Sequence, residues 1–96
     1  MILELQKAVH DNAVRHGFWE SPVNLGEKVA LIHSELSELL EVFRDPEAEG
    51  TVGEELADTV IRVMDLAQYL GIDLFHEIEA KHKININRSH KHNKRF

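Results

Sequence analysis

Apolar residues recur at alternating steps of three and four along most of the chain, the spacing that places side chains on one face of an α-helix. The first segment, from about residue 2 to 16, carries Ile2, Leu5, Val9 and Ala13 in this pattern. Two longer stripes comprise Val29, Ile32, Leu36, Leu39 and Phe43, and then Leu56, Val60, Val63, Ala67 and Leu70. No segment alternates strictly as a half-buried β-strand does. The pattern predicts an all-α domain in which these stripes form the buried seams between helices.

Turn and capping residues divide this pattern into four predicted helices. Asn24 with Glu27, and Thr51 with Glu54, have the spacing of N-terminal capping boxes. We expect the remaining boundaries at Gly17, at Asp45-Pro46, at Gly71, and at Asp73, which caps a last helix running to about Ile84 or a little beyond. The sequence therefore predicts one four-helix bundle-type domain over residues 1–88, followed by a basic tail over residues 89–96.

Two pairs of carboxylates, Glu35-Leu-Ser-Glu38 and Glu55-Leu-Ala-Asp58, lie within the second and third predicted helices. Residues three apart share a helix face, and these pairs border the apolar stripes, so we expect all four to converge at the rim of the helix interface. Without a cation, four such groups would repel one another. Oxygen ligands suit Mg²⁺, with Mn²⁺ as a substitute, better than zinc. Either pair alone would more often belong to a solvated helix face.

Composition limits the function further. A chain of 96 residues forms one domain with a modest core, and its formal net charge is −6. Because the chain has no cysteine, disulfides and thiolate metal sites are excluded, and a reducing, cytoplasmic location is expected. No apolar run approaches membrane-spanning length, so no membrane partner is expected. The sequence also lacks a glycine-rich phosphate loop and any interpretable serine–histidine pair for nucleophilic catalysis.

The charges are distributed unevenly along the chain. All 17 acidic residues lie within residues 1–79, together with only five of the 11 strong bases. The final 17 residues carry no acid, and their bases are Lys81, Lys83, Arg88, Lys91, Lys94 and Arg95. Such a cationic strip is suited to a metal-chelated polyanion such as a nucleotide phosphate chain. A solubilising tail, or a strip that neutralises a neighbouring subunit, is the alternative. Nucleic acid is an unlikely partner because the acidic body repels phosphate backbones.

Several motifs together resemble a known family. They are the two carboxylate pairs, the segment from Thr59 to Ala67 (Thr-Val-Ile-Arg-Val-Met-Asp-Leu-Ala), the Leu-Gly-Ile-Asp ending at Asp73, and the Lys-His-Lys-Ile-Asn-Ile-Asn-Arg running from Lys81 to Arg88. This arrangement, from about Leu25 to the end, resembles the MazG-like branch of the all-α nucleoside triphosphate pyrophosphohydrolases. Ser34 stands where many members have a further Glu, which is similar to the sparser Glu-x-x-Glu form of dimeric dUTPase relatives.

The resemblance implies Mg²⁺-dependent hydrolysis of a nucleoside triphosphate to the monophosphate and pyrophosphate. The metal ligands would be Glu35, Glu38, Glu55 and Asp58, with Glu38 also accepting the proton of the attacking water. Arg62 is placed to meet a phosphate, and a salt bridge to Asp58 is its alternative role. Further substrate contacts are expected from residues of the basic strip, also across a subunit boundary, namely Lys81, Asn85, Arg88, Lys91 and Lys94. Trp19 could stack on a base or simply cover the end of the bundle.

Two other classes of function remain open at this point. A dUTP/dCTP hydrolase or a phosphoribosyl-ATP pyrophosphohydrolase of the same superfamily would share the metal centre and differ in the base pocket. A non-catalytic helical oligomerisation module would share only the apolar stripes. Apolar residues also occur outside those stripes, at Leu31, Leu40, Val42, Ile61 and Met64. We therefore expect a homodimer, or a homotetramer built as a dimer of dimers.

Overall fold

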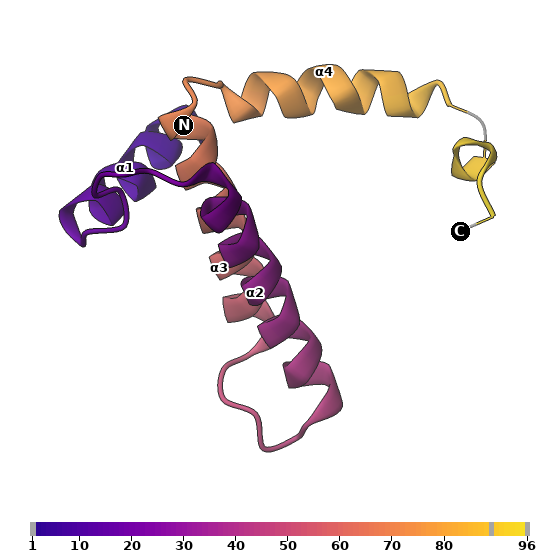
Figure 1. Cartoon of the computed structure of the whole chain (residues 1–96). Coiled ribbons are helices and arrows are strands. Elements are labelled where there is room, and N and C mark those ends of the chain that lie inside the picture. Colours follow the sequence, from indigo (N-terminus) through magenta and orange to yellow (C-terminus); the bar gives the residue numbers. More distant parts are fainter. Residues whose placement is uncertain (1, 89, 96) are drawn as a thin grey trace.

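The computed structural model describes residues 2–88 and 90–95, and all regular structure in these ranges is helical. The elements are α1 (Ile2–Arg15), α2 (Leu25–Arg44), α3 (Val52–Tyr69), α4 (Leu74–Ile86) and the short 3-10 helix η1 (His90–Asn93) (Figure 1). The predictions of an all-α chain and of four α-helices are confirmed. None of these helices is long and apolar enough to cross a membrane.

The helix boundaries follow the predicted capping residues. The side-chain oxygens of Asn24, Thr51 and Asp73 each accept a hydrogen bond of 3.1 Å from the backbone N–H three residues later. These contacts satisfy donors that the first turn of a helix leaves unpaired. Gly17 and Gly71 follow the ends of α1 and α3 with φ angles of +84° and +71°, the left-handed conformation that ends many helices.

The body of the molecule is built around α3. Both α1 and α2 pack against α3, and the loop between α2 and α3 makes these two helices antiparallel neighbours (Figure 1). The fully buried side chain of Gln6 links α1 to α3 and to the turn that follows α3. Its Nε2 donates to Gln68 Oε1 at 3.1 Å and to the carbonyl of Ile72 at 2.7 Å, while its Oε1 accepts from the N–H of Leu74 at 3.3 Å. The interior of this body is therefore partly polar.

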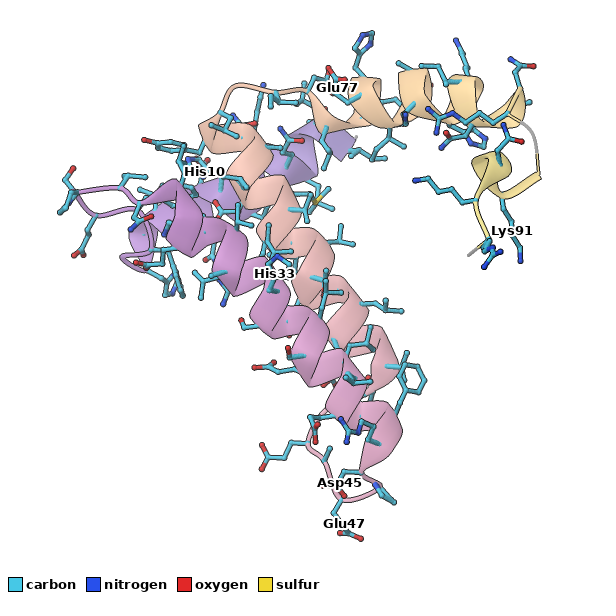
Figure 2. All side chains as sticks on the ribbon, turned by 45° about the vertical axis from the view of Figure 1, so that its right-hand side comes forward. His10, His33, Asp45, Glu47, Glu77 and Lys91 are labelled. Atoms are coloured by element: carbon cyan, nitrogen blue, oxygen red, sulfur yellow. The ribbon has the colours of Figure 1, made fainter. Side chains whose placement is uncertain are left out.

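In contrast, α4 projects away from the body and approaches it only where it begins (Figure 1). Figure 2 shows the same arrangement from another side. Its apolar residues Ile78, Ile84 and Ile86 are 53%, 53% and 66% exposed. The predicted four-helix bundle is thus only partly present within one chain. Three helices pack together, and the fourth extends from them after Asp73, whose own backbone is extended and changes the direction of the chain.

The apolar stripes do not form the buried seams that the sequence predicted. Among the residues that the structure describes, only Met64 and Ala67 are buried apolar residues. Stripe residues exposed by 39–69% are Ile2, Leu5, Val29, Leu36, Phe43, Leu56, Val60 and Leu70. Val9, Ala13, Ile32, Leu39 and Val63 are half-buried. The prediction is wrong because α2 and α3 meet along the neighbouring row, which carries Glu35 and Glu55, and this leaves most of the apolar row facing outward.

Candidate metal centre

The contact between α2 and α3 brings the four predicted carboxylates together. Glu35 and Glu38 come from α2, and Glu55 and Asp58 from α3. One carboxylate oxygen each from Glu35, Glu55 and Asp58 lies within 4.8 Å of the other two. Glu38 lies close enough to Glu55 for its negative charge to raise the pKa of that group. The predicted convergence is therefore observed for Glu35, Glu55 and Asp58, while the role of all four groups as metal ligands stays a prediction.

The four groups differ in burial. Glu35 and Glu55 are only 7% and 8% exposed, whereas Glu38 and Asp58 are exposed. The sequence placed all four at the rim of the interface, and this is wrong for the two that point inward. The Oε2 atom of Glu55 is buried and has no hydrogen-bond partner. A buried carboxylate oxygen without a partner is costly, so this atom is a candidate position for a ligand.

The loop between α2 and α3 encloses the other oxygen of Glu55. Gly50 has a φ of +88°, and a Cβ atom at this position would lie 2.6 Å from Glu55 Oε1. Any other residue at position 50 would be strained at this φ and would push the Glu55 carboxylate aside, so glycine permits the close approach of the loop. Burial, followed by the negative charges of Glu38, Asp58 and Glu35, raises the pKa of Glu55 above its ordinary value. A cation among these groups would counteract both effects.

The geometry and chemistry of the cluster fit Mg²⁺. Mg²⁺ binds oxygen at about 2.1 Å, so two ligands on opposite sides of one ion lie about 4.2 Å apart. The three converging oxygens are spread over a similar distance, at most 4.8 Å. Small side-chain movements would therefore close the cluster around an ion. A set made only of carboxylate oxygens favours Mg²⁺ or Mn²⁺ and lacks the nitrogen or sulfur ligands typical of zinc.

Arg62 lies across the same seam. Its Nε donates to Glu35 Oε1 at 2.7 Å, and its guanidinium carbon lies 5.5 Å from the centre of the Phe18 ring. The sequence suggested either a phosphate or Asp58 as its partner. The suggested ion pair with Asp58 is not the one observed, because Arg62 points across the seam towards α2 rather than back along α3. A contact with phosphate stays a prediction.

Two cavities adjoin the carboxylates. The larger, of about 570 Å³, is strongly acidic and is lined by Ser37, Glu38, Glu41, Ala48, Glu49, Gly50, Glu54 and Glu55. The smaller, of about 270 Å³, is lined by Val9, Asn12, Ala13, Phe18, Glu35, Asp58, Ile61, Arg62 and Asp65. Among these described lining residues, Arg62 is the only strong base. The smaller cavity is thus the better place for an anionic group beside the metal centre.

Trp19 belongs to an aromatic cluster at the end of the body. Its ring stacks on Tyr69 with 4.2 Å between the ring centres, and the ammonium group of Lys28 lies 4.4 Å from the Trp19 ring centre. Its Nε1 donates to Asp65 Oδ1 at 2.8 Å, and His10 Nδ1 lies 2.7 Å from the same oxygen. The structural role left open by the sequence is therefore observed, while stacking on a base stays untested.

The sequence reasoning did not anticipate the contacts of His10, Asp65 and Tyr69. A signal existed for Asp65, because it is the one charged residue between Val63 and Tyr69 and continues the row of Asp58 and Arg62. No comparable signal distinguished His10. Its role depends on the packing of α1 against α3, which sequence spacing does not specify.

The predicted substrate contacts of the basic strip do not reach the carboxylates within one chain. Lys81 and Asn85 lie on the projecting α4, Arg88 follows it, Lys91 lies in η1 and Lys94 comes after it. In Figure 2 the labelled Lys91 is far from Asp45 and Glu47, which mark the loop between α2 and α3. A role of these residues at the metal centre would therefore require a second copy of the chain.

Comparisons with protein-family models, with curated proteins and with solved structures find no significant match to this chain.

Proposed function

We propose that the protein is a Mg²⁺-dependent nucleoside triphosphate pyrophosphohydrolase, which converts a nucleoside triphosphate and water to the monophosphate and pyrophosphate. The observation that supports this most is the convergence of carboxylate oxygens from Glu35, Glu55 and Asp58, together with the buried, unpartnered Oε2 of Glu55. Such a cluster is costly without a cation, and its oxygen ligands suit Mg²⁺. The resemblance of the motifs to the MazG-like enzymes suggests the reaction.

The four carboxylates and Arg62 can be given separate roles in the proposed reaction. Glu35, Glu55 and Asp58 would hold the ion, which supplies charge neutralisation for the phosphates and a bound water of lowered pKa. Glu38 is exposed and borders the larger cavity, so it can contact both the cluster and solvent. It is the proposed acceptor of the proton from the attacking water. Arg62, beside the smaller cavity, is the proposed contact for a phosphate oxygen.

We further propose that the chain works as a homodimer or a homotetramer. Because only two apolar residues are buried in the described part of the chain, one copy has little hydrophobic stabilisation to offset the entropy of folding. The outward apolar residues of α2 and α3 are suited to burial against a second copy. A neighbouring α4 could then bring Lys81, Asn85, Arg88, Lys91 and Lys94 to the metal centre. This arrangement would account for the distance between acidic and basic regions within one chain.

The deciding experiment is an assay of the purified protein with Mg²⁺ and a panel of nucleotides that includes dUTP, dCTP and phosphoribosyl-ATP. Products are separated by anion-exchange chromatography, and pyrophosphate with the monophosphate is expected. EDTA should stop the reaction, and Mn²⁺ should substitute for Mg²⁺. The preferred nucleotide distinguishes the enzyme classes from one another. If a folded, metal-supplied protein hydrolyses none of them, the non-catalytic oligomerisation module, which the exposed apolar faces also favour, becomes the better proposal.

A further inference from the structure

Arg62 already places a positive charge at the carboxylate cluster. Its Nε donates to Glu35 Oε1 at 2.7 Å, and the two side chains are 27% and 9% exposed respectively. Glu35 is also one of the three residues whose oxygens converge at the proposed metal position. We propose that Arg62 is an exchangeable internal cation: it neutralises Glu35 while the centre is free of metal, is displaced when a divalent cation binds, and then binds an anion beside it. This inference rests on the proposed metal centre.

Arg62 and a divalent cation should compete for Glu35, because both would lie beside the same carboxylate. An arginine beside a carboxylate opposes the binding of a second cation to that carboxylate, because its charge already stabilises the anion. A divalent cation approaching Glu35 meets the same opposition, and its repulsion from the guanidinium adds to it. Because Arg62 is about a quarter exposed, it can leave Glu35 without being buried unpaired, so the exchange costs little.

The smaller cavity provides a place for the displaced guanidinium. Arg62 lines this cavity together with Glu35 and Asp58, and its guanidinium lies near the Phe18 ring. The nearby carboxylate of Asp65 is already engaged, because its Oδ1 is in contact with His10 and Trp19. A released Arg62 therefore presents its N–H donors to the cavity beside the metal position, in the planar geometry that matches a phosphate. The divalent cation and the phosphate should consequently bind cooperatively.

The first test measures Mg²⁺ binding by isothermal titration calorimetry to the wild type and to Arg62→Gln. If Arg62 competes with the ion, Arg62→Gln should bind Mg²⁺ about tenfold more tightly. Arg62→Lys, which keeps the charge, should stay within about threefold of the wild type, because most of the opposition is Coulombic. The matched control is Arg44→Gln, which removes the same charge from an exposed position in the last turn of α2. It should leave the affinity nearly unchanged.

Two other outcomes of the Mg²⁺ titration would contradict the inference. Unchanged or weaker Mg²⁺ binding by Arg62→Gln would overturn this inference and leave Arg62 as a support that positions Glu35, while the metal centre itself would stand. Absence of Mg²⁺ binding to the wild type would overturn the metal centre and the inference together. Circular dichroism verifies that each variant retains its helices.

A second measurement follows the wild-type protein and uses a variant only to assign one resonance. The Nε–H resonance of Arg62 in a ¹⁵N NMR spectrum reports its hydrogen bond to Glu35, and it is assigned by its loss in Arg62→Lys. Saturating Mg²⁺ should shift this resonance and speed its exchange with water. Inorganic phosphate should then shift it again with Mg²⁺ present, and should have little effect without Mg²⁺. A resonance that Mg²⁺ leaves unchanged would overturn the displacement, and equal phosphate effects in both conditions would overturn the coupling.

Discussion

The two sides of the α2–α3 pair have opposite chemistry. Where the helices meet, Glu35 and Glu55 are buried. Arg62 of α3 reaches across to α2 and pairs with Glu35. On the outward side, Phe43, Leu56 and Val60 are exposed by 50% or more. A chain that folds alone normally buries its apolar side and exposes its charges. The reversal is the pattern expected if the inner side binds a cation and the outer side packs against a second copy, as proposed above.

The two sides of the α2–α3 pair also make different contributions to the stability of the fold. Buried like charges destabilise the folded chain unless a cation accompanies them, and exposed apolar residues contribute nothing until they are covered. Metal binding and association would each therefore stabilise the fold by mass action. The largest effects should come from removing the charges of the inner side, followed by changes to the outer side.

The strongest change should be the loss of a carboxylate. Asp58→Ala or Glu38→Ala should lower kcat by about a thousandfold or more, since metal-centred charge stabilisation contributes several kcal/mol to the transition state. The metal-free fold should remain intact, because each substitution relieves repulsion around Glu55. Steady-state kinetics and circular dichroism measure the two effects. Glu47→Ala, in the loop between α2 and α3, is the control, and activity near the wild-type level in Asp58→Ala would refute the assigned centre.

A charge on the outer side should prevent association. Phe43→Lys combined with Leu56→Lys should convert the oligomer to monomers and lower Tm by roughly 15–30 °C, because about 2 kcal/mol is lost for each of the two apolar side chains that association buries. Multi-angle light scattering gives the mass, and calorimetry gives Tm. Val14→Lys introduces the same charge on α1, away from this side, and should change neither quantity greatly. A wild type that is monomeric at micromolar concentration would contradict the proposed assembly.

Glu55 should make the metal-free protein sensitive to pH. Its pKa is raised in the folded state, so the unfolded chain releases this proton at a lower pH than the folded chain does. Below the ordinary glutamate pKa of 4.5 both states are protonated; as pH rises from there through the raised folded pKa, stability is lost. The Tm advantage of Glu55→Gln over the wild type should therefore grow with pH and then level off. A constant difference across this range would argue against a buried, charge-crowded Glu55.

The smallest effect is expected from the C-terminal segment. Deleting residues 89–96 removes Lys91, Lys94 and Arg95, so KM for the nucleotide should rise several-fold while Tm changes by only a few degrees. Substituting the same three bases by Gln removes their charges and keeps the segment, so it separates the effect of charge from the effect of deleting eight residues. If both changes leave KM and kcat as they were, these bases have no part in the site. The carboxylate centre would be unaffected by that outcome.

Local features of the chain were determined by the sequence alone. The capping residues Asn24, Thr51 and Asp73, with the glycines after α1 and α3, were sufficient to place the helix boundaries, because caps act over one turn of backbone. The three-residue spacing within each carboxylate pair likewise placed Glu35 with Glu38 and Glu55 with Asp58. These interactions span few residues, and their geometry is fixed by the helix itself.

Only the tertiary structure decided which row of each helix turns inward. Apolar and acidic rows are adjacent on α2 and α3, and a rotation of a fraction of a turn exchanges them, so periodicity could not choose between the two. The sequence reasoning assigned the apolar row to the interior, as is usual for a chain that folds alone. The packing instead buried Glu35 and Glu55, paired Arg62 with Glu35, and directed α4 away from the body. These outcomes depend on contacts between segments far apart in the sequence, which local patterns do not specify.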